Sequence, residues 1–234
     1  MPILLAVYFQ KRELVIPGQV LAEGKYRAGE GTFFQKGKII SSLVGLAEIK
    51  NNVVRVVPLQ GVYIPRVGDI VIGTIIQVGA TNWKVDIGGP YLASLHANNA
   101  LRKPYDDDLA IYMDIGDTIA AQIISFDRTH GPFLTTKERG LGKLRNGMLL
   151  EISPAKVPRV IGRKGSMINM IKNETGVDIL IGQNGRIWLK SNDPAMLRLA
   201  IRAIRKVEEE AHTSNLTDRI HDMLENEKKR GNEQ

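Results

Sequence analysis

The chain has 234 residues, of which 43% are hydrophobic, and its 32 basic and 25 acidic side chains give a formal net charge of +7. This length suits two or three small domains, and the hydrophobic content excludes a generally disordered chain. The absence of cysteine excludes disulfides, thiolate metal sites and cysteine nucleophiles. No run of 18 apolar residues could span a membrane, and the apolar start lacks the basic leader of a signal peptide. We therefore expect a cytoplasmic protein with no membrane partner.

The positive charge is unevenly distributed. Residues 1–65 carry eight basic and four acidic groups, residues 66–140 carry seven and nine, residues 141–212 carry thirteen and seven, and residues 213–234 carry four and five. A basic excess favours a polyanionic partner, and the excess is largest in the third segment. A basic surface that serves only solubility is the alternative.

Residues 1–62 predict a β domain. Runs rich in β-branched residues, such as E-L-V-I-P and N-N-V-V-R-V-V-P, alternate with glycine and proline. The segment G-E-G-T-F-F-Q-K-G-K-I-I is typical of turn, strand, turn and strand. Since no helical period is convincing here, we expect strands throughout.

Residues 63–140 predict a second β domain. Five strand-like segments follow one another: D-I-V-I-G-T-I-I-Q-V-G, W-K-V-D-I-G, Y-L-A-S-L-H, D-T-I-A-A-Q-I-I-S-F-D and P-F-L-T-T-K. The longest connection, from Asn98 to Gly116, separates the third from the fourth. Five short strands in about 70 residues match a Greek-key barrel of the OB type.

Residues 146–212 change character and predict an α+β domain. A strand over 149–153 precedes a short helix from Ala155 to Ile161, and a second helix runs from Ser166 to Thr175 with Gly176 placed to end it. The strands V-D-I-L-I-G and R-I-W-L-K are joined by Q-N-G, a hairpin signal. A last helix opens at Pro194 behind Asn192 or Asp193, and a helical tail is expected over 213–234. The order β-α-α-β-β-α is that of a type I KH domain.

The tetrad Gly162-Arg163-Lys164-Gly165 lies between the two short helices. Two glycines let the backbone approach a nucleic-acid backbone without a Cβ in the way, and the amide groups that open the next helix favour phosphate. Arg163 and Lys164 add cations to the same turn. This is how the G-x-x-G loop of a KH module clamps about four nucleotides of a single strand.

The surroundings of the tetrad add further RNA-binding candidates. Lys156 and Ile161 precede it, and bases could lie on apolar side chains such as Ile168, Ile179 and Ile181. For each isoleucine, plain core packing is the alternative. For the tetrad itself, the alternative is an ordinary linker between two helices.

The segments V-G-D-I-V-I-G-T-I-I-Q-V-G and W-K-V-D-I-G-G-P-Y-L-A-S-L-H resemble the OB-fold RNA-binding domain first described in a large ribosomal protein of the small subunit, the S-one type. Such barrels bind single strands through exposed aromatic rings and basic side chains. For Trp83 and Phe126, a place in the core is as plausible as a stacking role. The candidate residues are Tyr91, His96, Arg102, Lys103 and Arg128.

The first 65 residues carry a more specific resemblance. V-I-P-G-Q-V-L, G-E-G-T-F-F-Q-K-G-K-I-I-S-S-L-V-G-L and P-L-Q-G-V-Y-I-P-R-V-G-D-I-V-I-G are similar to the RNA-binding cap subunit of the archaeal exosome, of the kind that combines OB and KH domains. The resemblance extends over essentially the whole chain in the same domain order. The second cap subunit of that family ends in a zinc ribbon, which a chain without cysteine cannot form.

That resemblance implies a non-catalytic subunit, three copies of which sit on a hexameric ring of ribonuclease-PH-like subunits. The N-terminal domain would dock on the ring, the barrels would surround the entry pore, and the KH domains would lie at the periphery. Such a cap captures RNA and feeds its 3′ end to phosphorolytic sites. The tetrad would then act as the KH loop, with Arg102, Lys103 and Arg128 facing the pore.

Catalytic and metal chemistry has little support in the sequence. Asp106-Asp107-Asp108 could bind magnesium, but three consecutive carboxylates cannot all point one way, so a solvated acidic loop is expected. No nucleophile elbow, phosphate-binding P-loop or dinucleotide fingerprint occurs. We expect no cofactor, no metal and no intrinsic catalysis. The alternatives are a transcription elongation factor with OB and KH modules and, from the enzymes, a polynucleotide phosphorylase.

Overall fold

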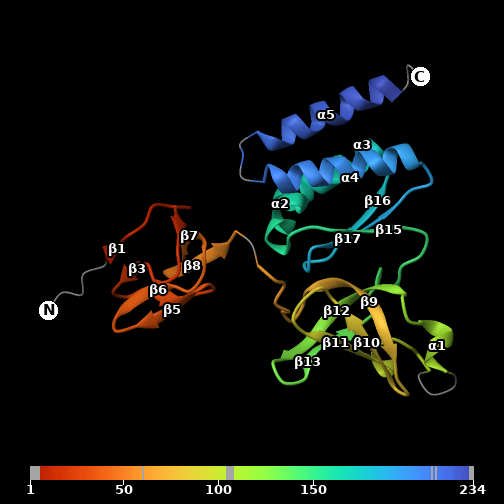
Figure 1. Cartoon of the computed structure of the whole chain (residues 1–234), viewed down its shortest axis with the longest axis horizontal. Helices are drawn as coiled ribbons and strands as arrows, with labels where there is room; N and C mark the ends of the chain where they lie inside the picture. The colour runs from red at the N-terminus through yellow and green to blue at the C-terminus, as the bar shows by residue number, and fades with distance from the viewer. Residues whose placement is uncertain (1–5, 60, 104–107, 212, 214, 232–234) are drawn as a thin grey trace. The chain divides into compact units, whose positions relative to one another are not determined.

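The structure, a computed structural model, describes residues 6–59, 61–103, 108–211, 213 and 215–231. Two compact units divide the chain, Met1–Gly61 and Val62–Gln234. Figure 1 shows the strands of the first unit in red to orange, and the barrel and helices of the second in yellow to blue. Among the helices within the described ranges, none combines the length and apolar character needed to cross a membrane.

The first unit consists of two four-stranded sheets, ordered β1-β3-β6-β5 and β2-β7-β8-β4. A two-residue turn at Lys36 and Gly37, both with positive φ, joins β5 to β6. Val15, Leu21 and Ile39 lie in a small core between the sheets. The strands are β1 (Ala6–Val7), β2 (Leu14–Val15), β3 (Val20–Glu23), β4 (Arg27–Ala28), β5 (Thr32–Gln35), β6 (Lys38–Ser41), β7 (Gly45–Lys50) and β8 (Val53–Pro58).

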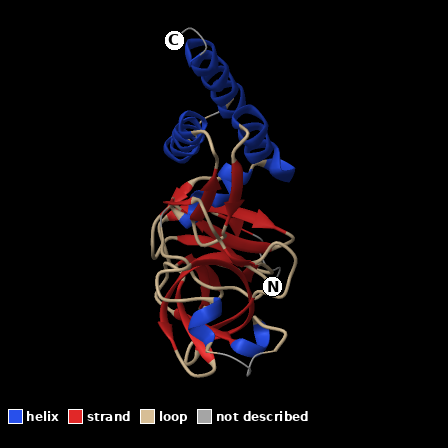
Figure 2. Cartoon of the chain, turned by 90° about the vertical axis from the view of Figure 1, so that its right-hand side faces the viewer, coloured by secondary structure: helices blue, strands red, loops and turns tan. Residues whose placement is uncertain are grey.

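The second unit begins with the predicted five-stranded barrel. Its strands follow the order β13-β11-β10-β9-β12, and β12 also pairs with β13, which closes the ring visible in Figure 2. All pairs are antiparallel except β11 with β13. The strands are β9 (Ile70–Val78), β10 (Asn82–Asp86), β11 (Leu92–His96), β12 (Thr118–Asp127) and β13 (Gly131–Thr135), and a further strand, β14 (Gly142–Lys143), pairs with β12.

Alternation along these strands fills the barrel. Trp83 and Val85 of β10 point inward and are fully buried, and the indole Nε1 of Trp83 donates to the carbonyl of Met113 at 2.8 Å. Trp83 is therefore a core residue. The long connection between the third and fourth strands carries η1 (Ala97–Asn99) and α1 (Leu109–Tyr112).

The predicted KH fold follows, with an antiparallel sheet ordered β15-β17-β16. Gly176, with φ 66°, ends α3, and the carboxylate of Asp193 accepts from two amide groups of the first turn of α4. The elements are β15 (Met148–Glu151), η2 (Pro154–Lys156), α2 (Val157–Ile161), η3 (Arg163–Gly165), α3 (Ser166–Thr175), β16 (Asp178–Ile181), β17 (Arg186–Lys190), α4 (Pro194–Glu209) and α5 (Leu216–Gly231).

One helix differs from the prediction. The segment expected as a single helix from Ala155 to Ile161 forms a 3₁₀ turn followed by the short α2. Pro158 explains the break, because it has no N–H with which to continue the α-helical hydrogen bonds back to Pro154.

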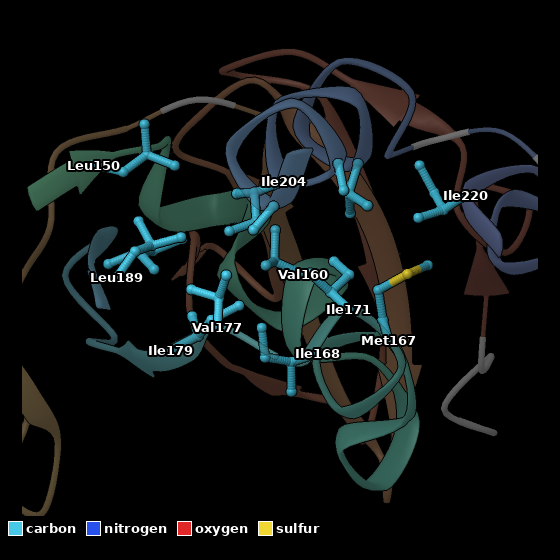
Figure 3. Packing of buried hydrophobic residues seen from close by; sticks show 14 of the residues in the cluster. Leu150, Val160, Met167, Ile168, Ile171, Val177, Ile179, Leu189, Ile204 and Ile220 are labelled. Atoms are coloured by element: carbon cyan, nitrogen blue, oxygen red, sulfur yellow. The ribbon is translucent and has the colours of Figure 1, made fainter. Parts of the chain in front are cut away.

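The KH core joins the sheet to four helices. Figure 3 shows Leu150, Ile179 and Leu189 from the strands pointing toward Val160, Ile171 and other helical side chains. The tail helix α5 contributes as well, since Leu216, Ile220 and Leu224 are almost completely buried in this cluster. The predicted tail is a helix, and it packs as part of the KH core.

Candidate nucleic-acid interface

The tetrad forms a sharp turn between α2 and α3, here called the KH loop (Gly162–Gly165). Gly162 has φ 77° and ψ 175°, and Gly165 has φ 80° and ψ 8°. A Cβ on Gly162 would lie 2.7 Å from the backbone nitrogen of Met167, closer than real side chains allow. Gly162 is thus required both by its conformation and by the close approach of α3.

The two side chains between the glycines extend into solvent. Arg163 and Lys164 are both exposed, and neither has an ion-pair partner among the residues that the structure describes. Other arginines of this domain are engaged: Arg202 pairs with Glu227 and Arg219 with Glu210. The loop therefore presents two uncompensated cations beside the amino terminus of α3, where the helix dipole adds positive potential.

The residues flanking the KH loop divide into surface and core. Lys156 and Ile161 are half-buried, and Ile161 packs against the KH core. Ile168 and Ile179 are 8% and 5% exposed. They therefore belong to the core, which was the alternative to a base contact at these positions. Ile181 is half-buried and keeps some surface.

In the barrel, Tyr91 and Phe126 come together at one end of β12, and Phe126 is partly buried against the barrel core. The rings of Tyr91 and Phe126 meet edge to face, with centroids 5.1 Å apart and an interplanar angle of 73°. Arg128 follows in the turn between β12 and β13 and is exposed. An exposed cation two residues along the chain from an aromatic pair suits a nucleotide, whose base can stack while its phosphate meets the charge.

The other barrel candidates are separate from that group. The Nδ1 atom of His96 accepts from the backbone of Asn98 at 3.3 Å and caps η1. Arg102 and Lys103 are exposed in the connection that follows η1. Of the acidic triplet, Asp106 and Asp107 lie outside the described residues, and Asp108 caps α1 through a hydrogen bond from the backbone of Ala110.

A row of side chains on the outer face of the barrel was not predicted from the sequence. Lys84 pairs in register with Ser94, Ser94 with Phe133, and Phe133 with Ser125, across four strands. The Nζ atom of Lys84 donates to the hydroxyl of Ser94 at 2.7 Å. Alternation around Trp83 and Val85 could have placed Lys84 outside. The position of Phe133 next to Ser94 could not be predicted, because it depends on the parallel pairing of β13 with β11, two strands far apart in the sequence.

Comparison with known proteins accounts for the whole domain order. Three family models match in turn: the N-terminal domain of the exosome RNA-binding protein RRP4 over residues 12–60, the RRP4 S1 domain over 62–125 and a KH domain over 147–195. The exosome complex component Rrp4 of Thermococcus kodakarensis is 48% identical over 223 residues, which cover 93% of this chain and 87% of that relative. The chain belongs to the Rrp4 family.

Further members of the Rrp4 family agree. The exosome complex component Rrp4 of Thermofilum pendens is 43% identical over 228 residues, covering 94% of this chain and 96% of that protein. A crystal structure assigned to an exosome complex RNA-binding protein superposes with a TM-score of 0.67 at 42% identity, covering 72% of this chain and 98% of that one. The family resemblance and the fold class inferred from the sequence are confirmed.

The glycines of this Rrp4-family KH domain allow a matched test of the loop geometry. Gly162→Ala is expected to lower the free energy of unfolding by about 3 kcal/mol, because a strained backbone and a clash with Met167 combine. Gly176→Ala, where φ is also positive but no atom lies within 4 Å, should cost only about 1 kcal/mol. Urea denaturation of both variants measures the difference, and equal losses would contradict the proposed clash.

Proposed function

We propose that this chain is a non-catalytic cap subunit of an archaeal exosome, which captures single-stranded RNA and feeds its 3′ end into a phosphorolytic ring of ribonuclease-PH-like subunits. The observation that carries the proposal is an exposed, uncompensated cationic G-x-x-G loop in a member of the Rrp4 family. Its relatives are named as components of the exosome complex. A transcription elongation factor fits less well, because residues 12–60 match the RRP4 N-terminal domain.

The KH loop is proposed as the main RNA contact. Gly162 and Gly165 let the strand approach the backbone, while Arg163 and Lys164 neutralise phosphates. Lys156 and Ile161 flank the loop and would extend the contact, Lys156 toward phosphate and Ile161 toward a base.

The barrel is proposed as a second, weaker contact. Tyr91 packs against Phe126, and Arg128 follows Phe126 by two residues. Lys84 belongs to the face of β10 and β11, the second and third barrel strands, on which OB folds bind oligonucleotides, and Phe133 of β13 adjoins that face through its pairing with Ser94. His96 ends strand β11, Arg102 and Lys103 follow it in the next connection, and all three are proposed to face the pore of the assembled cap. Acidic groups outnumber basic ones over residues 66–140, so this contact should be local.

The N-terminal unit is proposed to dock on the ring, with three copies of the chain forming the cap. Its surface is unusually apolar: it holds ten of the nineteen large hydrophobic side chains recorded as exposed in the described chain, including Ile16 and Phe34, each 60% exposed. The second unit is far longer and holds nine. This high density of exposed apolar side chains supports docking, because contiguous apolar patches mark protein–protein interfaces.

A decay assay on labelled single-stranded RNA tests this function. The chain alone should bind the RNA, more weakly as salt rises, and leave its length unchanged. Together with the ring subunits and inorganic phosphate, it should accelerate shortening from the 3′ end relative to the ring alone. Shortening by the chain alone would refute a non-catalytic role, and absence of RNA binding would refute capture.

A further inference from the structure

The turn between β16 and β17 is inserted into the barrel. Asn184, which is 4% exposed, donates through Nδ2 to the carbonyls of Ile72 at 2.7 Å and Ile87 at 2.8 Å. Its Oδ1 accepts from the backbone nitrogen of Ile72 at 3.2 Å. The side-chain amide thus takes the place of a neighbouring strand for Ile72.

Arg186 makes a second, charged connection and is 8% exposed. Its Nη1 and Nη2 donate to the carbonyl and the carboxylate of Asp86 in the barrel, both at 2.6 Å, and its Nε donates to Glu151 of β15 at 2.8 Å. Burial alone would raise the pKa of Asp86, but the hydrogen bonds from Arg186 and the amide of Gly88 outweigh burial and lower this pKa. The pair therefore stays charged at neutral pH.

The turn between β16 and β17 covers an apolar position on the outer surface of the barrel. Val71 and Ile75 of β9 point into the barrel, so Ile72 faces outward, yet Ile72 is fully buried. The backbone of Gln183 also donates to the carbonyl of Ile70 at 2.8 Å. Opening this junction, defined as Asn184 and Arg186 with Ile72, Asp86 and Ile87, would leave buried polar groups without partners, so the orientation of the KH domain on the barrel is fixed.

We propose that the junction makes the KH loop and the barrel face one rigid RNA-binding unit, with Asn184 and Arg186 as positioning residues that touch no RNA. They fix the separation and direction of the two RNA-binding surfaces, so that one strand long enough to reach both is bound by both at once. This inference rests on the proposed capture of RNA by the two domains.

Preorganisation explains why a rigid junction would strengthen binding of a strand that reaches both surfaces. When two sites are held at a fixed spacing, the second contact costs little additional conformational entropy. With the junction open, the short segment 145–147 between β14 and β15 would still tether the domains, so the second contact would be weakened rather than lost. A strand that reaches only the KH loop would not sense the difference.

The test compares oligouridylates of about 5 and about 20 nucleotides on the full chain, since a KH groove holds about four. Asn184→Ala and Arg186→Ala should weaken binding of the long strand by about three- to tenfold and change binding of the short strand less than about twofold. The matched control is Arg202→Ala, which removes the exposed cation of the ion pair between Arg202 of α4 and Glu227 of α5 and should leave both affinities unchanged.

The outcomes distinguish a positioning role of the junction from the lack of such a role. Hydrogen exchange at the amide of Gln183, which donates to the carbonyl of Ile70 and loses its acceptor in neither variant, shows whether the junction has opened. Opening without loss of affinity for the long strand overturns the inference, as does equal loss on both strands. Where Arg186→Ala does not fold, Asp86→Asn removes one charge at a side chain that is 36% exposed and should give the same selective loss, more weakly. A wild-type chain that binds neither strand would refute the proposed function instead.

Discussion

Replacing Arg163 and Lys164 together by glutamate is expected to lower the affinity for single-stranded RNA by about 100-fold or more. Each of these exposed cations can make a charge-assisted contact with phosphate, and such contacts contribute about 1.5–3 kcal/mol, of which 1.4 kcal/mol corresponds to a factor of ten. The free energy of unfolding should change by less than about 0.5 kcal/mol, because neither side chain has an ion-pair partner in the described structure.

A salt titration separates this effect from general damage. Each phosphate contact with a single strand contributes about 0.7 to the slope of log affinity against log salt, so the double variant should lose roughly 1.4 in slope. The matched control replaces Lys190 and Arg198, two exposed basic residues on the same domain, by glutamate. If the control weakens binding as much as the loop variant, RNA contact at the KH loop is contradicted and only a diffuse basic surface remains.

Replacing Ile220 and Leu224 by alanine is expected to lower the free energy of unfolding of the KH domain by at least about 4 kcal/mol. Both side chains are fully buried between α5 and the rest of the KH core. Each truncation costs about 2–5 kcal/mol, although neighbours on one helix need not add. Domains are stable by only about 5–15 kcal/mol, so the variant should be close to unfolding.

Tryptophan fluorescence during urea denaturation follows this loss, because the chain has two tryptophans. Trp188 lies in β17 of the KH sheet and Trp83 in the barrel core. The matched control, Asp222→Ala on the exposed side of α5, should change the free energy of unfolding by less than about 0.5 kcal/mol. An unchanged midpoint in the double variant would show that α5 is dispensable for the KH core.

Much of the KH domain follows from the sequence, because its signals are local. A glycine with positive φ ends α3 at Gly176, and the carboxylate of Asp193 caps α4, so both helix bounds follow from neighbouring residues. The KH loop is equally local, since glycine is needed where φ and ψ exclude other residues. The same is true of the five barrel strands, whose alternation shows which residues point inward.

Contacts between distant segments determine the features of the fold that the sequence could not predict. The letters Q-N-G predicted a hairpin, but only the tertiary structure shows that Asn184 of that hairpin completes the hydrogen bonds of a barrel strand more than 100 residues earlier. The tail predicted a helix, whereas its burial depends on the faces that α3 and α4 leave open. Alternation assigns a side chain to a face, but it does not say which strand or domain will cover that face, because this depends on contacts between residues far apart in the chain.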